Sequence, residues 1–144
     1  MKKYLIFILL FFLLVGAASA IDYSKADTKV TLDDVDFNIP KGFGELENLS
    51  VNEKDANGTV KLASFFINEN NDFVMVSVVT SSEDIAGNLT NYVPEDVECE
   101  NATVKEHEGI KWQDDGEEFF LYIQGNDVVL IEAPDEAFIE NIVQ

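Results

Sequence analysis

The hydrophobic and polar positions along the chain show two pairs of strand-like segments. Residues 60–67 and 73–80 are rich in β-branched and aromatic residues, and five polar residues separate them. Residues 117–124 and 127–133 form a similar pair around a Gly-Asn dipeptide. Segments of this composition, joined by short polar turns, are typical of β-hairpins. The pattern therefore predicts two long hairpins.

The second predicted hairpin is apolar on both of its faces. If Gly125 and Asn126 form the turn, the period of a strand places two groups of side chains on opposite faces. Phe120, Tyr122, Val129 and Ile131 share one face, and Phe119, Leu121, Ile123, Val128 and Leu130 share the other. Two apolar faces are typical of strands buried on both sides. We therefore expect this hairpin at the centre of a sheet, covered on each side by helices or by a partner subunit.

Two further segments carry the signals of short helices. Residues 81–92 begin with the capping-box order Ser-Ser-Glu-Asp and continue with apolar residues at helical spacing. Residues 134–143 begin with proline, and acidic residues follow at the end where the helix dipole favours negative charge. A helix is predicted in each segment.

The remaining segments predict shorter elements. Residues 36–40 alternate polar and apolar positions and end at a proline, as a short strand does. Residues 43–58 are polar and irregular, which predicts a surface loop with room for one helical turn, and residues 97–112 predict one or two edge strands broken at Gly109. Together these elements predict an α+β fold: an antiparallel sheet of about five to seven strands, built on two hairpins and flanked by two short helices.

Residues 1–20 have the order of an export signal. Two lysines precede an unbroken apolar run, and small residues follow up to Ala20 in the pattern that signal peptidases accept. We expect cleavage after Ala20, a lead-in segment at 21–34 and a single domain at 35–144. An uncleaved membrane anchor is the alternative, because the charge-free stretch is near the short limit for a bilayer span.

The net charge of the chain excludes some classes of binding partner. The sequence contains no arginine, and after Ala20 its 28 acidic residues face only seven lysines, a formal charge of −21. Such a polyanion repels phosphate groups, which excludes nucleic acids and electrostatic adsorption to an anionic membrane. Hydrophobic residues make up 47% of the sequence, which is enough to bury a core.

Four Asn-x-Ser/Thr triplets predict an N-glycosylated surface. Their asparagines are Asn48, Asn57, Asn88 and Asn101. About one such triplet is expected by chance, and polar loops rich in Asn and Thr are the alternative explanation for the excess. The single cysteine, Cys99, allows no internal disulfide. An exported glycoprotein without disulfides fits an archaeal cell envelope better than a eukaryotic secretory route.

Candidate reactive groups are few. Cys99 and His107 are the only cysteine and histidine, and no pairing between them is indicated, so we assign no catalytic residue and no zinc site. Acidic residues around Gly116 offer the oxygen ligands that calcium prefers. These residues are Asp114, Asp115, Glu117 and Glu118. They lack the spacing of an EF-hand, so a weak calcium site is the alternative to a solvated acidic surface, and no other cofactor is indicated.

The order of the segments resembles that of known small domains. The residues that carry the resemblance are Phe37, Ile39, Pro40, Gly42 and Phe43, followed by a loop, a long hairpin, a helix, a glycine-marked strand, a second hairpin and a C-terminal helix. This order is similar to small exported domains of methanogen-type archaea and, in layout, to the Mog1/PsbP-like α/β sandwich. Members of those groups are mostly binding or accessory modules without catalytic residues. The resemblance covers nearly the whole chain after Ala20, and it implies a fold class and no site residues.

The function favoured by these observations is that of an exported, non-enzymatic domain at the cell surface or outside the cell. It would act through its surface as a binding or adhesion module. Its expected partner is an envelope protein, a glycan or a peptide, and an apolar sheet face offers an interface for a homodimer. The alternative is a small carboxylate-based hydrolase, or a domain that assists or inhibits an enzyme, because paired acids in a cleft can cleave glycosides.

The charge also predicts a stability that depends on salt. Repulsion between carboxylates opposes compaction, and salt screens it over a Debye length of about 8 to 10 Å. The melting temperature should therefore rise when sodium chloride is added, and it should be higher near pH 5 than at pH 8 in dilute buffer. Thermal unfolding followed by circular dichroism measures both shifts. A melting temperature that does not move would show that the charges are too dispersed to affect stability.

Overall fold

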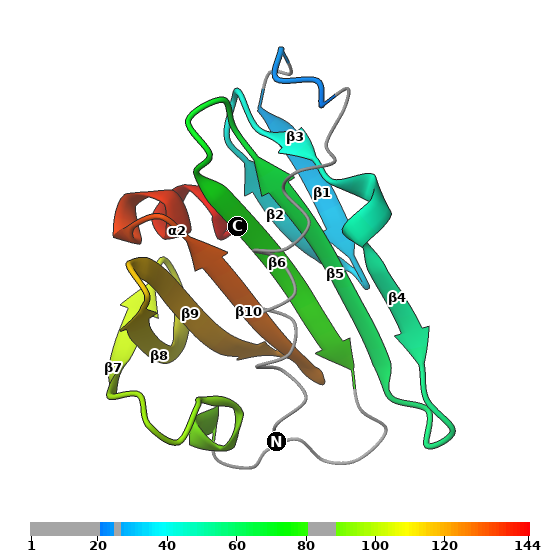
Figure 1. The fold of residues 1–144 in the computed structure, drawn as a ribbon. Coiled ribbons are helices and arrows are strands. Elements are labelled where there is room, and N and C mark those ends of the chain that lie inside the picture. Colours follow the sequence, from blue (N-terminus) through cyan, green and yellow to red (C-terminus); the bar gives the residue numbers. More distant parts are fainter. Residues whose placement is uncertain (1–20, 25–26, 81–88) are drawn as a thin grey trace.

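The fold is built on one antiparallel sheet of eight strands. The computed structural model describes residues 21–24, 27–80 and 89–144. Its strands are β1 (Thr28–Leu32), β2 (Val35–Ile39), β3 (Gly44–Glu45), β4 (Val51–Lys54), β5 (Val60–Ile67), β6 (Phe73–Thr80), β7 (Cys99–Val104), β8 (His107–Asp114), β9 (Glu117–Gln124) and β10 (Asp127–Ala133). The sheet has the order β3-β5-β6-β10-β9-β8-β7, and β4 pairs with the same edge of β5 as β3 (Figure 1). The other described elements are α2 (Glu136–Ile142) and the 3-10 helices η2 (Glu47–Leu49) and η3 (Leu89–Tyr92).

Both predicted hairpins are confirmed with their expected bounds. β5 and β6 pair along their full length, and the Asn68 side chain organises their turn. Its Oδ1 atom accepts hydrogen bonds of 2.9 Å from the backbone N–H groups of Asn70 and Asp72. β9 and β10 form the second hairpin, and β10 also pairs with β6. This pairing of β6 with β10 joins the two hairpins at the centre of the sheet.

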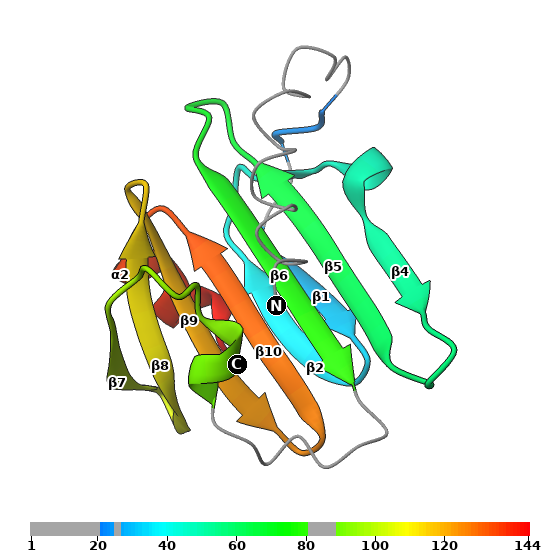
Figure 2. The same cartoon turned by 60° about the horizontal axis from the view of Figure 1, so that its bottom comes forward.

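One face of the sheet, which we call the back face, is covered by the β1–β2 hairpin and α2 (Figure 2). The central strands present fully buried side chains to it, among them Val76 of β6 and Val129 of β10. Phe37 of β2 packs in the same cluster, and its backbone forms a bridge with Val143. The four residues of the second hairpin that were predicted to share one face all lie in this cluster: Phe120, Tyr122, Val129 and Ile131. The back face is therefore the main core of the domain.

The opposite face, which we call the front face, holds two smaller apolar clusters. One lies on β8, β9 and β10 and packs against the segment around η3, whereas the other lies on β5 and β6 and packs against η2 and β4. The first contains Ile110, Trp112, Phe119, Leu121 and Val128, and the second contains Ala63, Phe65, Phe73 and Met75. Leu130 packs against both clusters. The second hairpin is thus covered on both faces, but by a hairpin and a helix on the back and by short irregular segments on the front.

The described residues contain more strands than the predicted five to seven. β3 and β4 lie within residues 43–58, which were predicted as a loop, and β1 lies in the lead-in segment 21–34. These three strands are short, and Gly44 is their only buried residue. β3 and β4 therefore lack the alternation of buried apolar and exposed polar residues by which a strand is recognised. β1 does alternate, with Val30 and Leu32 packed against the core and Lys29 and Thr31 exposed. The single helical turn expected in residues 43–58 is η2.

Of the two predicted helices, the one at the C-terminus is confirmed as α2. Asp135 caps it, because its carboxylate accepts a hydrogen bond of 3.0 Å from the backbone N–H of Phe138. The helix predicted over residues 81–92 lies mostly outside the described residues, and its last four residues form the 3-10 helix η3. None of the described helices has the length and apolar composition needed to cross a membrane.

The predicted strand break at Gly109 is wrong. Gly109 lies inside β8 and pairs with Tyr122 of β9. A Cβ atom at this position would lie 2.2 Å from the carbonyl oxygen of Leu121 and 3.0 Å from a ring carbon of Phe120. Glycine is therefore required by the close approach of β8 to β9, and not by a change in chain direction.

Replacement of this glycine should destabilise the fold. Gly109→Ala is expected to lower the free energy of unfolding by about 2 kcal/mol or more, because its Cβ meets the backbone of the neighbouring strand. Gly116→Ala is the control: a Cβ there meets nothing within 4 Å, and its backbone strain costs about 1 kcal/mol. Urea unfolding measures both losses. If both variants lose the same free energy of unfolding, β8 can move away from β9 to accommodate the new Cβ atom without a loss of stability.

Candidate functional site

The front face contains an apolar groove between its two clusters. The groove encloses about 80 Å³. Its lining consists of Val51, Lys61, Leu62, Ala63, Phe65, Met75, Ser77, Val79, Tyr92, Pro94, Trp112, Phe119 and Leu130. Among the described lining residues, polar side-chain atoms come only from Lys61, Ser77, Tyr92 and Trp112. A concave lining with so few polar groups is suited to an apolar ligand.

Two small residues form the floor of this groove. Ala63 of β5 and Ser77 of β6 are directly opposite each other, and Leu130 of β10 lies on the other side of Ser77. The next pair along β5 and β6 on the same face consists of the larger residues Phe65 and Met75. Paired residues share one face of a sheet, so two small side chains stand side by side among large ones. The sheet surface is hollow at this row because of that difference in size.

Aromatic side chains form one wall of the groove. Trp112 of β8 and Phe119 of β9 are opposite each other, with ring centroids 5.1 Å apart and ring planes inclined by 3°. Trp112 is only 6% exposed, so the single tryptophan belongs to the interior of the groove and not to an outer surface. Tyr92 and Pro94, in and beside η3, line the groove from outside the sheet.

A buried carboxyl group lies beside the groove. Glu132 of β10 pairs with Met75 on one side and Phe119 on the other, and both of these residues line the groove. The residue is 6% exposed. Burial, reinforced by the nearby carboxylates of Glu117 and Asp114, raises the pKa of Glu132 to about 8. The Glu132 carboxyl group is therefore mostly protonated at pH 7.

Two more carboxylates stand at the same end of the groove. Glu117 and Asp114 are opposite each other in the β8–β9 hairpin and share the front face. Within the described residues, the Oε2 atom of Glu117 is shielded from solvent and has no hydrogen-bond partner. Burial raises the pKa of Glu117, and the charges of Asp72 and Asp115 add to the rise. We call Glu132, Glu117 and Asp114 the acidic end of the groove, although they lie next to its lining residues and not among them.

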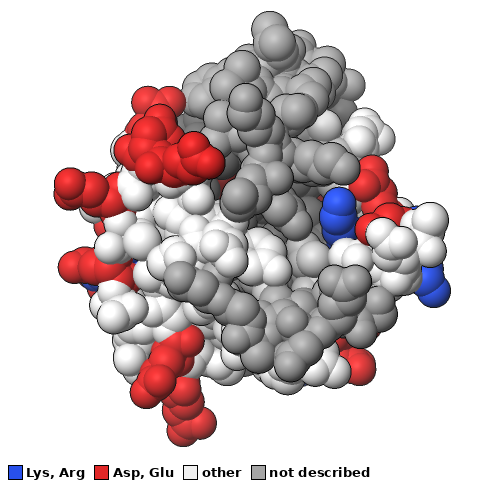
Figure 3. Space-filling model, turned by 90° about the horizontal axis from the view of Figure 1, so that it is seen from below, with Lys and Arg blue, Asp and Glu red and all other residues white. Residues whose placement is uncertain are grey.

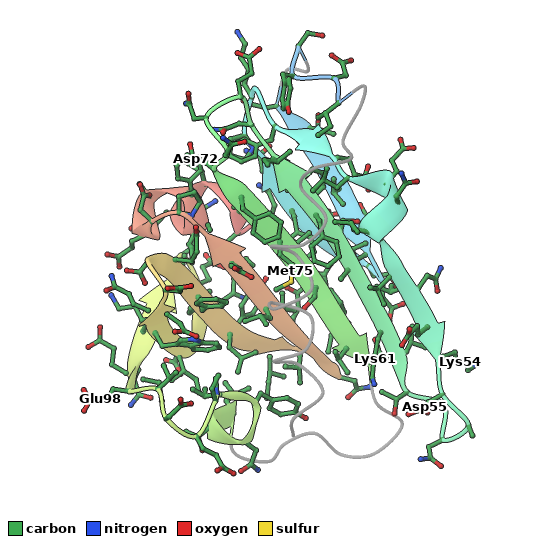
Figure 4. The ribbon with its side chains drawn as sticks, viewed as in Figure 1. Lys54, Asp55, Lys61, Asp72, Met75 and Glu98 are labelled. Carbon is green, nitrogen blue, oxygen red and sulfur yellow. The ribbon has the colours of Figure 1, made fainter. Side chains whose placement is uncertain are left out.

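The other end of the groove carries a lysine. Lys61 precedes Phe65 by four residues on β5, which places it about 13 Å along the strand from the row of Met75, and Figure 4 shows the two labelled side chains well apart. Asp55 lies near this lysine: a hydrogen bond from the backbone N–H of Thr59 is the main cause that lowers the pKa of Asp55, and the charge of Lys61 contributes. The groove is therefore polarised along its length.

The cations of the surface do not neutralise the acidic end. Seen from below, Asp and Glu side chains stand at the margin of the molecule and Lys side chains are few (Figure 3). Lys29 forms an ion pair of 2.6 Å with Asp36, and Lys111 lies 3.4 and 3.1 Å from Glu100 and Glu136. Lys29 is on β1 behind the sheet, and Lys111 faces the back together with α2. The charges that affect the pKa values of Glu132 and Glu117 are all carboxylates.

The structure does not gather the four predicted calcium ligands in one place. Asp114 and Glu117 face the front, whereas Glu118 pairs with Gln113 on the back and accepts a hydrogen bond from its side chain. Asp115 lies in the turn itself, with a φ of 52°. In the part of the chain that the structure describes, no three His, Cys, Asp or Glu side chains are grouped as a metal site requires.

The predicted glycosylation sites lie on the surface where they are described. Asn48 of η2, Asn57 in the turn before β5 and Asn101 of β7 are exposed. Asn88 lies outside the described residues. Exposure is what attachment of a glycan requires, and glycosylation itself stays a prediction.

The single cysteine and the single histidine lie on opposite faces of the sheet. Cys99 is exposed on β7 and pairs with the front-facing Trp112. His107 begins β8 on the back face, where its ring lies 4.4 Å from that of Tyr122 and its Nε2 atom lies 2.9 Å from the backbone oxygen of Gln144. A thiol–imidazole pair is therefore not formed by these residues.

Sequence reasoning missed Glu132 as a site residue. A signal was present, because Glu132 follows Val128 and Leu130 on the face that the strand period assigns to apolar residues. An acid at such a position in a central strand is either paired or neutral. The groove itself leaves no signal in the sequence, because it depends on which small residues stand opposite each other.

The buried carboxyl group of Glu132 predicts a specific dependence of stability on pH. Its pKa is about 8 in the folded protein and 4.5 in a solvated chain, so unfolding releases a proton between these values. The free energy of unfolding should then fall as the pH rises, by up to about 1.4 kcal/mol per pH unit. Glu132→Gln cannot ionise, so it should leave stability near pH 5 almost unchanged and raise it progressively toward pH 8.

Urea unfolding between pH 5 and pH 8 measures this difference. Glu53→Gln is the matched control, because it removes the same charge from an exposed position of β4 and should keep the slope of the wild type. A Glu132→Gln variant with the wild-type slope would show that Glu132 ionises freely in the folded protein.

Comparisons with known proteins identify no family for this chain. The chain matches no protein-family model, no curated protein and no solved structure. The groove and its acidic end therefore carry the functional conclusion by themselves.

Proposed function

We propose that this protein is an exported, non-enzymatic binding domain that holds an apolar ligand in the groove on its front face. The observation that carries this proposal is the groove, with a floor of small residues and walls of aromatic and aliphatic side chains. Apolar surface that leaves water for such a lining contributes about 25 cal/mol per Å² to binding. The lining is part of a well-packed sheet, so little order has to be gained on binding.

The chemistry of the lining supports binding and not turnover. Its described residues include no Asp, Glu, His or Cys, and Lys61 and Ser77 form no hydrogen bond with each other, as a nucleophile and its base would. Export is supported by the signal-like order of residues 1–20 and by the exposure of the three described sequon asparagines. We place the domain at the cell surface or outside the cell, as a component of an archaeal envelope.

One observation favours a second candidate function, that of a small carboxylate-based hydrolase. Glu132 and Glu117 are two carboxyl groups of raised pKa beside a groove, and glycosidases need one acid that stays protonated at neutral pH. The apolar lining offers few hydrogen bonds to a sugar, which is why binding is the preferred function. Turnover of an aryl glycoside, lost in both Glu132→Gln and Glu117→Gln, would reverse this preference.

The proposed binding can be measured with the tryptophan in the groove wall. N-phenyl-1-naphthylamine is a neutral apolar dye that accepts energy from tryptophan, so binding in the groove should quench the emission of Trp112 and increase that of the dye. Ala63→Phe places a large side chain on the groove floor and should weaken dye binding at least tenfold. Ser77→Leu fills the same floor from the neighbouring strand and should act in the same way.

Ile123→Ala is the control, because Ile123 is a 36% exposed apolar residue of β9 outside the groove lining. It should bind the dye as the wild type does. Wild-type protein that does not quench, or filled variants that fold and still bind the dye with unchanged affinity, would contradict the proposed function. A dimer that dissociates in Ala63→Phe without any dye binding in the wild type would assign the face to a second copy.

A further inference from the structure

The acidic end of the groove has features that an apolar ligand alone does not explain. Glu132 is 94% shielded from solvent, and the causes of its raised pKa are burial and two neighbouring carboxylates, with no hydrogen bond among them. Glu117 adds a buried oxygen without a partner in the described part of the chain. A buried acid without donors destabilises the fold, and a packed core would have an apolar residue in its place.

The position of these acids connects them to the groove. Glu132 stands between Met75 and Phe119, two lining residues, and it follows Leu130 of the groove floor on the same face of β10. Glu117 precedes Phe119 by two residues on β9 and therefore shares its face. Neither carboxyl group is among the lining residues, so a ligand has to extend past Met75 and Phe119 along β10 to meet them.

We propose that the ligand is a small organic cation, whose aryl or alkyl body fills the groove and whose terminal ammonium group pairs with Glu132 and Glu117. This inference rests on the proposed binding function and names its ligand class. Charge complementarity supports it, because the ammonium would supply the hydrogen-bond donors that both carboxyl groups lack. The neighbouring charges on Asp114, Asp72 and Asp115 are also negative and favour the same cation.

Two other occupants fit the site less well. A divalent cation needs six or more oxygen ligands, and the described residues contain no group of three side chains arranged for a metal. A peptide needs partners for its backbone, but β6, β10 and β9 are central strands whose backbone groups are already paired in the sheet. An ammonium group on an apolar body requires only the carboxylates and the lining that are present.

The test compares two displacing ligands that share one apolar body. The amine 4-phenylbutylamine and the neutral 4-phenylbutan-1-ol are titrated into the complex of the purified protein with N-phenyl-1-naphthylamine. The measurement is made at pH 7 in 0.5 M sodium chloride, where the Debye length is about 4 Å and the diffuse field of the surface is screened. The amine should displace the dye at a concentration at least tenfold lower than the alcohol.

The variants assign this preference to named groups. Glu132→Gln and Glu117→Gln should each reduce the preference for the amine to threefold or less, while the alcohol still displaces the dye. Glu53→Gln removes a charge from the exposed face of β4 and should keep the full preference. If the wild type does not bind the dye, the proposed function is wrong. If the wild type binds the dye but shows no preference for the amine over the alcohol, only this inference is wrong. The variants retain the groove, so their dye binding shows that the groove is intact.

The protonation of Glu132 supplies a second readout. The Glu132 carboxyl group is mostly protonated in the free protein at pH 7, so pairing with an ammonium ion releases its proton to the buffer. Titration calorimetry in two buffers of different ionisation enthalpy should show release of about one proton per bound amine and none for the alcohol. The affinity for the amine should rise between pH 6 and pH 8, whereas that for the alcohol should stay constant.

Four results would overturn the inference. The first is equal displacement by amine and alcohol in the wild type, and the second is a preference for the amine that survives in both Glu132→Gln and Glu117→Gln. The third is displacement of the amine by millimolar calcium chloride at constant ionic strength, which would assign the acids to a metal. The fourth is tighter binding of acetyl-phenylalanyl-lysine amide than of the amine, which would assign the groove to a basic peptide.

Discussion

The pairing of β10 with a strand on each side is the constraint on which the rest of the structure depends. Because β6 and β9 flank it, both of its faces lie in the middle of the sheet and both must be covered. The back is covered by the β1–β2 hairpin and α2, and Val129 is fully buried there. Of the described residues, short segments cover the front and pack on two clusters that share Leu130, and the groove lies between these clusters.

Much of this architecture could be predicted from periodicity, because burial imposes it. The two hairpins, the assignment of Phe120 and Ile131 to a common face, and the C-terminal helix follow from the apolar pattern. The strands β3 and β4 could not be recognised, because pairing with a neighbour requires only backbone groups and leaves polar side chains free. β1 was missed although Val30 and Leu32 alternate with polar residues, because its five residues were assigned to the lead-in segment. The calcium site was predicted from residues that are close together in the sequence. Neighbouring residues of a strand point to opposite faces, so Glu117 and Glu118 are separated by the sheet.

Carboxylates have two different physical roles in this molecule. Those at the margin stay hydrated and give the protein its charge, and single pairs such as Lys29 with Asp36 change that charge little. Glu132 at the acidic end is taken out of water beside other acids, so its carboxyl group is more stable protonated than ionised at neutral pH. The number of acids in the sequence therefore overstates the negative charge of the folded protein at neutral pH. The number of acids also does not reveal the few positions where an acid is buried next to core residues.

The open edges of the sheet are formed by strands with polar surfaces. On β4, Asn52, Glu53 and Lys54 are exposed, and on β7 so are Glu100 and Asn101. An unpaired edge is a template for addition of a strand from another chain, and charged side chains with their hydration oppose that addition. A sugar on Asn101 would stand on the outermost strand and add bulk to the same barrier. In the part of the chain that the structure describes, both edges of the sheet thus carry polar and charged side chains that oppose edge-to-edge aggregation.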